Sequence, residues 1–264
     1  MPAVSVVMAV WNPDREYVTA AIRSILEQTF RDLELVIVED PSERPLDLAQ
    51  FSDDRIRLIR RERRGSLGSA LNEGIAAAHA ELIARIDADD VALPRRIERQ
   101  YEFMQQHPEI AVYGSRIRVI DDSGATVGRR MLRLGHEEIA AALRRYNCIS
   151  HPSVMFRKAP VVAVGGYDRE RIAEDYDLWC RLLLAGARFA NSDEELVLYR
   201  FHEQAAKYRG VHEAIRVTID IKKQYFAGRF TLGDRLRLAA ETVLLRLPPA
   251  LIIRLFRLLE YRQT

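Results

Sequence analysis

The sequence has few of the features that hold together secreted or membrane-spanning proteins. It contains only two cysteines in 264 residues, Cys148 and Cys180, and their wide separation matches no metal-ligand spacing. It has no uninterrupted apolar run of about 18 residues, so we expect no transmembrane helix. The first residues, MPAVSVVMAVWNPDRE, become charged too early for a secretory leader. We therefore expect a cytoplasmic protein with two inert thiols.

The chain also has little net charge. Its 40 basic and 38 acidic residues give a formal charge of +2. Such a balance argues against a general nucleic-acid binder. Apolar residues make up 48% of the sequence and charged residues 30%, which is typical of a folded globular protein. A chain of this length can bury a large core without disulfides or a structural metal.

Strand-like and helix-like patterns alternate through residues 1–90. Strands are predicted at Val4–Val10, Glu34–Val38, Arg55–Ile59 and Leu82–Ile86, and helices at Val18–Leu26 and Ser69–Ala80. This alternation predicts an α/β fold, with a single Rossmann-like, mostly parallel sheet flanked by helices.

The strand signals stop at His202. Before that point, further strands are predicted at Ile110–Val119, Ser153–Arg157 and Glu195–Tyr199, with helices at Pro94–Gln106 and Tyr176–Ala185. Residues 203–264 predict three helices, broken near Gly228–Gly233 and at Pro248–Pro249. We therefore divide the chain into a main domain, 1–202, and a helical C-terminal extension, 203–264.

Polar residues directly follow three of the predicted strands. They are Trp11 and Asn12 after the first strand, Glu39 and Asp40 after the second, and Asp87, Asp89 and Asp90 after the fourth. Ligands of open α/β sheets bind at the carboxyl ends of the strands. We therefore expect these side chains to meet in one binding site.

The sequence Asp87-Ala88-Asp89-Asp90 places three carboxylates within four residues. They repel one another unless a cation lies among them. Oxygen ligands of this kind suit Mg²⁺ or Mn²⁺ shared with substrate phosphates. The alternative is a solvated acidic loop in which Asp90 caps the helix that begins at Pro94.

A second acidic pair, Glu174-Asp175, stands just before a predicted helix and follows the loop Gly165–Asp168. A carboxylate there could take a proton from an attacking hydroxyl group. The alternative is a helix start, where acids interact favourably with the helix dipole.

The C-terminal extension carries arginines among apolar residues. Arg254 and Arg257 lie between Leu251 and Leu259, and Arg235, Arg237 and Arg246 continue the pattern upstream. Basic amphipathic helices can lie on anionic membranes. They can equally pack on the main domain or on a partner subunit, and the sequence leaves homo-oligomerisation open.

Between Val4 and His202 the chain resembles glycosyltransferase family 2, which has the nucleotide-sugar-binding type A fold. The resemblance is carried by an ordered set of segments: VSVVMAVWN, SILEQTF, ELVIVED, LGSALNEGIAAAHAELIARIDADD, LPRRIERQ, HPSVMFR, VGGYD, AEDYDLWCRLLLAG and LVLYRFH. No single segment is specific, but their order and spacing together are.

The resemblance implies an inverting, metal-dependent enzyme that transfers a sugar from a nucleotide donor to a hydroxyl group of a glycan or lipid-linked glycan, in bacterial surface glycan biosynthesis. Its implied site residues are Ala9 and Trp11 at the nucleobase, Asp40 reading the base, Asp87 near the ribose, Asp89 on Mn²⁺ or Mg²⁺ together with Asp87, His202 as a further metal or phosphate contact, and Asp175 as general base.

Two further residues are weaker candidates for the donor site. His151 could contact the donor or the acceptor, and Arg200, beside His202, could contact the diphosphate. A hydrogen-bonded structural histidine and a surface arginine are the respective alternatives. Pro41 stands where the family commonly has glycine, and it restricts Asp40 to extended conformations.

The chain lacks the QxxRW-type signature and the membrane spans of processive synthases, which favours a single addition over polymerisation. A nucleotidyltransferase acting on sugar phosphates is the rival enzyme class. It normally has a glycine-rich loop after the first strand, where this chain reads WNPDRE. A non-catalytic, membrane-associated sugar-binding scaffold is the other alternative.

Overall fold

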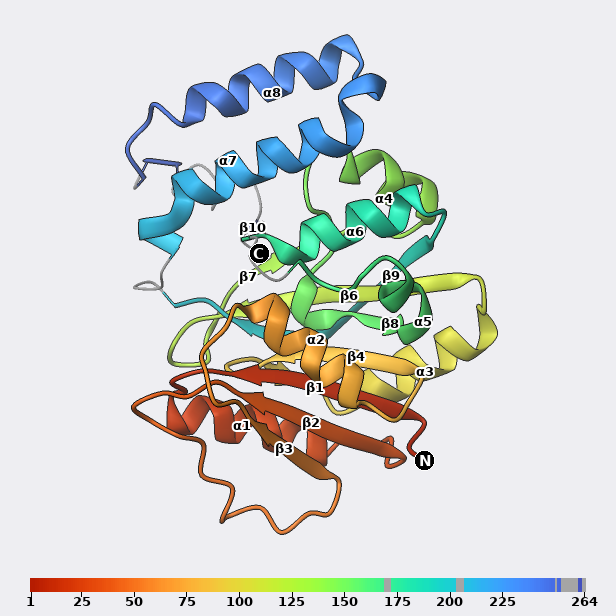
Figure 1. Cartoon of the computed structure of the whole chain (residues 1–264), viewed down its shortest axis with the longest axis vertical. Coiled ribbons are helices and arrows are strands. Elements are labelled where there is room, and N and C mark those ends of the chain that lie inside the picture. The colour runs from red at the N-terminus through yellow and green to blue at the C-terminus, as the bar shows by residue number, and fades with distance from the viewer. Residues whose placement is uncertain (169–171, 203–206, 250, 253–260, 263–264) are drawn as a thin grey trace.

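The computed structural model describes residues 1–168, 172–202, 207–249, 251–252 and 261–262. These residues form one ten-stranded sheet with helices packed on both faces, and two long C-terminal helices lie stacked at one end (Figure 1). The α/β class, the flanking helices and the C-terminal helices are therefore as predicted.

The parallel part of the sheet consists of the four strands that were predicted first. In spatial order they are β4 (Leu82–Asp87), β1 (Val4–Val10), β2 (Leu33–Glu39) and β3 (Ile56–Arg60). Strands covered on both faces carry continuous apolar runs rather than alternating ones. All seven residues of β2 are buried, which explains why this part of the sheet was visible in the sequence.

The other part of the sheet is largely antiparallel. Its strands are β5 (Val91–Ala92), β6 (Ile110–Ile120), β7 (Thr126–Arg130), β8 (Met155–Arg157), β9 (Arg188–Arg200) and β10 (Tyr261–Arg262). Strand β8 pairs antiparallel with both β4 and β6, whereas β9 runs parallel to β6. The complete sheet is thus mixed. The turn Asp121–Gly124 joins β6 to β7.

Helices cover both faces of the sheet and enclose one core layer on each face. They are α1 (Arg15–Leu26), α2 (Leu67–Ala77), α3 (Arg96–Gln106), α4 (His136–Leu143), α5 (Lys158–Ala163), α6 (Glu174–Leu184), α7 (Lys207–Phe226) and α8 (Leu232–Leu244). Val7 of β1 belongs to the core beneath α2, α4 and α6. Val6 and Met8 belong to the core beneath α1 and α3. Successive side chains of β1 thus point alternately into the two core layers.

The C-terminal extension begins with two of the three predicted helices. Helix α7 packs on α6, and α8 packs on α7. The break between them falls at residues 227–231, and Thr231 then caps α8 by accepting a hydrogen bond from the Asp234 N–H. Most of the third predicted helix, including Arg254 and Arg257, lies outside the described residues. Strand β10 was not predicted.

Within the described part of the chain, no helix is both long enough and apolar enough to cross a membrane.

Both cysteines are buried in the core and neither forms a disulfide. Burial raises the pKa of the Cys148 thiol to about 11 and also raises that of Cys180. Both thiols are therefore protonated at neutral pH, which agrees with the expectation that they are inert.

A buried carboxylate joins β1, β2, β3 and the end of α2 at the edge of the sheet opposite the predicted site. Glu34 accepts hydrogen bonds from Ser5 Oγ at 2.5 Å, from the His79 N–H at 2.7 Å and from Arg57 Nη1 at 2.9 Å. Burial by itself raises the pKa of Glu34, but these hydrogen bonds outweigh it and lower the pKa to about 2. Ionised Glu34 thus stabilises the parallel part of the sheet.

We expect Glu34→Gln to lower the free energy of unfolding at pH 7 by about 3 kcal/mol. Because the pKa falls from 4.5 to about 2 on folding, the advantage of the wild type is complete above pH 4.5 and disappears as the pH falls through about 2. Urea unfolding across this pH range measures the difference. The exposed Glu43→Gln variant is the control, and an equal loss in both variants would contradict the prediction.

Candidate active site

The strand register brings the predicted site residues to one edge of the sheet. Val10 of β1 is paired with Glu39 of β2, and Ala9 is paired with Asp87 of β4. The residues that follow these pairs, Trp11 and Asp40 among them, therefore start from neighbouring strand ends. The predicted convergence of the three strand ends is confirmed.

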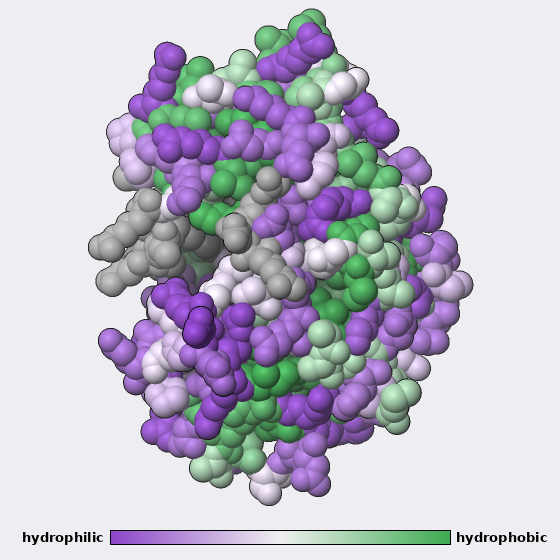
Figure 2. All heavy atoms as spheres, in the orientation of Figure 1, coloured by the Kyte–Doolittle hydropathy of each residue, from purple (hydrophilic) through white to green (hydrophobic). Residues whose placement is uncertain are grey.

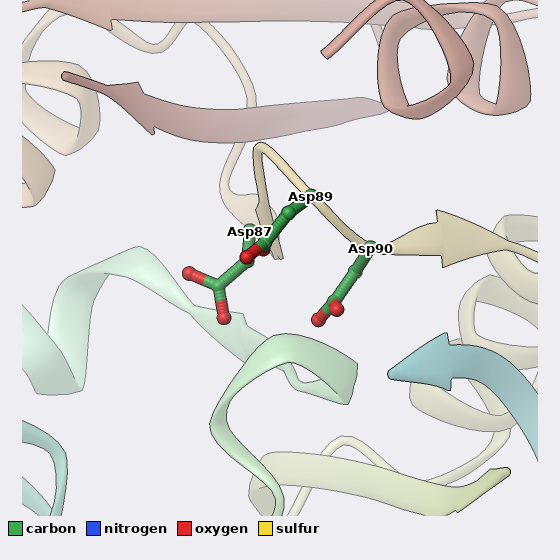
Figure 3. A group of neighbouring side chains, drawn as sticks. All are labelled: Asp87, Asp89 and Asp90. Atoms are coloured by element: carbon green, nitrogen blue, oxygen red, sulfur yellow. The ribbon is translucent and has the colours of Figure 1, made fainter. Parts of the chain in front are cut away.

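Three carboxylates gather after β4. One ligand oxygen from each of Asp87, Asp89 and Asp90 lies within 4.8 Å of the others, and Figure 3 shows the three side chains projecting to the same side of the loop. Burial and the charge of Asp87 raise the pKa of Asp89, and burial with both neighbouring charges raises that of Asp90 well above its ordinary value. This oxygen-rich, mutually repelling set fits a hard divalent cation.

Asp90 is fully buried, and its Oδ1 accepts a hydrogen bond from the Arg200 N–H at 2.8 Å. Its Oδ2 has no hydrogen-bond partner among the described residues. Helix α3 instead begins after Arg95 without any side-chain cap. The alternative in which Asp90 caps this helix is therefore wrong, because its carboxylate is turned inward toward β9.

A buried arginine on β4 balances part of this negative charge. The two terminal nitrogens of Arg85 bind the two carboxylate oxygens of Asp87, with Nη1 at 2.6 Å from Oδ2 and Nη2 paired with Oδ1. Only 3% of the Arg85 side chain is exposed. A bidentate pair of this kind fixes the direction as well as the charge of the Asp87 carboxylate.

His202 and Arg200 reach the same loop from the end of β9. His202 Nε2 lies 3.0 Å from Asp89 Oδ2, and its Nδ1 lies 2.6 Å from Asp122 Oδ1. Arg200 Nε donates to the Asp89 carbonyl at 3.2 Å, and its guanidinium stacks 4.2 Å above the Tyr17 ring. Arg200 therefore braces the backbone that carries Asp89. Its contact with a diphosphate stays a prediction, as does metal binding by His202.

The residues predicted for the nucleobase meet two arginines from the loop after β3. Asp40 is buried, and its Oδ1 accepts a hydrogen bond from Arg61 Nη1 at 2.7 Å. Trp11 is half exposed, with the guanidinium of Arg64 3.5 Å above its ring. Ala9 lies on β1 between two strands. One is β2, which Asp40 follows, and the other is β4, which ends at Asp87. The basic run at residues 60–64 thus touches the predicted site.

Asp175 lies in the first turn of α6, where two groups orient its carboxylate. Asn147 Nδ2 donates to Oδ2 at 2.6 Å, and the Tyr176 N–H donates to Oδ1 at 2.8 Å. Burial raises the pKa of Asp175, although these two hydrogen bonds oppose that effect. Ala173, just before the helix, has a left-handed φ of 61°, which costs a non-glycine residue about 1 kcal/mol. Strain of this kind commonly lies beside functional residues.

Glu174 precedes Asp175 in the chain, and its Oε1 lies 3.7 Å from Nδ1 of His151. Burial and the charge of Asp175 raise the pKa of Glu174 to about 7. Burial and the positive charge of Arg85 hold the pKa of His151 well below its ordinary value, so this imidazole is neutral. Its Nε2 lies 2.9 Å from the hydroxyl oxygen of Tyr167. His151 is thus a buried, hydrogen-bonded histidine, and a contact with substrate stays a prediction.

Arg85 links the two acidic groups electrostatically. The charge of Asp87 raises the pKa of Glu174 while Arg85 lowers it, and Arg85 also lowers that of Asp175. Residues that are far apart in the sequence therefore act on one another's ionisation. Sites with several mutually perturbed carboxyl groups are commonly catalytic.

Sequence reasoning missed the partners of the predicted acids. Arg85 carried a usable signal, because a charged residue inside an apolar strand needs a buried counterion. Arg61 belongs to the basic run at residues 60–64, whose composition does not indicate which acid it binds. Asn147 carried no signal, since it belongs to no pattern that indicates contact with α6. Tyr167 belongs to the loop Gly165–Asp168, but nothing in that segment indicates its hydrogen bond with His151.

Comparison with known proteins agrees with this arrangement. Residues 5–163 match the family described as "Glycosyl transferase family 2". The "O-antigen biosynthesis glycosyltransferase WbnJ" of Escherichia coli is 36% identical over 211 residues, which cover 77% of this chain and 82% of WbnJ. A second Escherichia coli protein, "UDP-Gal:alpha-D-GlcNAc-diphosphoundecaprenol beta-1,3-galactosyltransferase", is 29% identical over 85% of this chain and 82% of its own length.

Among solved structures, that of S. aureus TarS 1-349 in complex with UDP-GlcNAc superposes with a TM-score of 0.65. The match covers 91% of this chain and 79% of TarS 1-349 at 17% identity, so it shows a shared fold. Fold, site and sequence together define a sugar-transferring enzyme. The chain belongs to glycosyl transferase family 2, which sets aside the nucleotidyltransferase alternative.

The raised pKa of Glu174 provides a test of the acidic pair. Because Asp175 adds negative charge beside Glu174, we expect Asp175→Asn to lower the Glu174 titration midpoint from about 7. Carboxyl ¹³C NMR measures the midpoint, and Glu174→Gln assigns the resonance by removing it. An unchanged midpoint in Asp175→Asn would show that the two carboxyl groups do not interact.

Proposed function

We propose that this glycosyltransferase transfers a sugar from a nucleoside diphosphate to an acceptor hydroxyl group with inversion, and that Asp175 is the general base. The observation that carries the proposal is the position of Arg85, whose terminal nitrogens bind the Asp87 carboxylate and whose charge also lowers the pKa of Glu174 and Asp175. This position of Arg85 supports the proposal that the donor phosphates and the base share one site.

The proposed reaction is a single displacement. The Asp175 carboxylate takes the proton of the acceptor hydroxyl, whose oxygen forms the new bond to the anomeric carbon. The bond from that carbon to the diphosphate oxygen breaks, and the nucleoside diphosphate leaves with the electron pair. The Asn147 amide and the Tyr176 N–H hold the carboxylate in one orientation and favour its ionised form.

At the donor end, Asp87 and Asp89, with His202 beside Asp89, are the proposed ligands of Mn²⁺ or Mg²⁺. When bound, such a cation neutralises charge on the leaving diphosphate. Arg85 and Arg200 keep the two carboxylates in place, through the Asp87 side chain and the Asp89 carbonyl respectively. Asp40, Trp11 and Ala9 are proposed to hold the nucleobase.

The proposed substrates follow from the relatives. TarS was solved with UDP-GlcNAc, and a relative is named for UDP-Gal and a diphosphoundecaprenol-linked sugar. We therefore propose a UDP-sugar donor and a lipid-linked glycan acceptor, with a role in bacterial surface glycan biosynthesis. Such donors and acceptors meet at the cytoplasmic face of the membrane, where we place the enzyme as a peripheral protein.

Asp175→Asn keeps the shape of the side chain but removes its ability to accept a proton. We expect kcat to fall by about 10²–10⁴-fold, with little change in the affinity for UDP. Single-turnover transfer measures the rate, and calorimetry measures the affinity. Glu174→Gln is the matched control in the neighbouring carboxyl group. A larger loss in Glu174→Gln than in Asp175→Asn would assign the base to Glu174.

Asp89→Ala should weaken metal-dependent donor binding. We expect the affinity for UDP in the presence of Mn²⁺ to fall at least about tenfold, since even groups that only support a metal ligand are worth that much. Asp54→Ala removes an exposed carboxylate just before β3, at the other end of that strand, and is expected to bind normally. Equal affinity in the wild type and Asp89→Ala would exclude Asp89 as a metal ligand.

A further inference from the structure

Helix α8 has an apolar stripe that is exposed in the part of the chain that the structure describes. Leu232 is 75% exposed, Leu236 64% and Val243 55%, and the exposed Ala239 and Ala240 fill the space between them. Residues spaced by three, four and seven positions lie on one side of a helix. These five residues therefore form one continuous strip, which we call the outer face of α8.

The opposite side of α8 is already used for folding. Leu238, Leu244 and Leu245 pack against Ile215 and Ile219 of α7. Helix α8 is thus apolar on two sides. Its inner side packs on α7, whereas its outer face makes no part of that contact. Exposed apolar stripes of this kind commonly mark an interaction site.

The charges of α8 are sorted by side. Both of its acids point inward, where Asp234 binds Arg145 at 2.7 Å and Glu241 binds Lys222 at 2.5 Å. The charged residues that flank the outer face, Arg235 and Arg246, are both exposed. Across residues 227–249 no acidic side chain is exposed. In Figure 2 the surface over α8, at the top of the view, accordingly mixes hydrophobic and hydrophilic atoms.

We propose that the outer face of α8 lies in the surface of an anionic lipid bilayer. Leucine and valine side chains would enter the boundary between headgroups and acyl chains, while arginines contact anionic headgroups. A protein partner would also bury the apolar strip, but the exclusion of acids from this face matches a surface of uniform negative charge.

This surface would bring the proposed lipid-linked acceptor to the catalytic helix, a role that rests on the proposed function. Helices α8, α7 and α6 are stacked one on another (Figure 1). Tyr225 of α7 donates from its hydroxyl to Asp177 of α6 at 2.9 Å, two residues after Asp175. The membrane-facing helix and the proposed base therefore belong to one stack.

The test is sedimentation of the full chain with phosphatidylcholine vesicles, with and without about one-third phosphatidylglycerol. We expect the wild type to pellet with the anionic vesicles only. Leu236→Glu combined with Val243→Glu should lower binding at least about tenfold, because both side chains would have to enter the apolar layer charged. Val162→Glu in α5, where the valine is 56% exposed, is the matched control and should bind like the wild type.

Arg235→Gln combined with Arg246→Gln tests the charge separately. Each arginine near an anionic surface contributes about fivefold in partitioning, so the pair should weaken binding by roughly 25-fold. Absence of wild-type binding, equal binding to neutral vesicles, or unchanged binding of the Leu236/Val243 variant would each overturn the inference. So would a dimer in light scattering that the same variant dissociates, if vesicles are not bound.

The binding assay contains no substrate, so its outcome is independent of catalysis. If the Leu236/Val243 variant transfers sugar normally to a water-soluble acceptor and loses only vesicle binding, the inference and the proposed function both stand. Vesicle binding by a wild type that transfers no sugar would overturn the proposed function alone.

Discussion

The buried ion pair between Arg85 and Asp87 is the interaction on which the site depends. Four further carboxyl groups, on Asp89, Asp90, Glu174 and Asp175, lie within its electrostatic reach or beside Asp87. In a low-dielectric interior this many acids would mostly be protonated without a positive charge among them. Arg85 and the buried Arg96, whose charge interacts with Asp90, supply two positive charges against five carboxyl groups, and a divalent cation would balance part of the remaining negative charge.

The proposed functional carboxylates are held by side chains rather than left free. Asp40 is bound by Arg61, Asp89 by His202 and Asp175 by Asn147. Each partner comes from a different part of the chain, so the site is complete only when the mixed half of the sheet and the β3–α2 loop have folded. Such partners limit the rotamers of the acids and thus pre-organise the site.

Much of the fold could be predicted because its parallel half has a strong local signal. Strands β1, β2 and β4 are buried on both faces, which requires continuous apolar runs, and their carboxyl ends therefore marked the acids that follow. The other half was less visible. Strand β8 has only three residues, and β9 begins seven residues before the predicted Glu195, in a mostly polar stretch that pairs with β6.

The sequence by itself determined the fold class, the family and the acids at the strand ends, because burial periodicity and ordered motifs are properties of neighbouring residues. Only the tertiary structure decided that Asp90 turns inward, that Arg85 lies within electrostatic reach of the Glu174–Asp175 pair, and that the acids of α8 are hidden while its arginines are exposed. These outcomes depend on which distant segments meet. Pairing across the fold is set by packing in three dimensions, and local sequence patterns do not encode it.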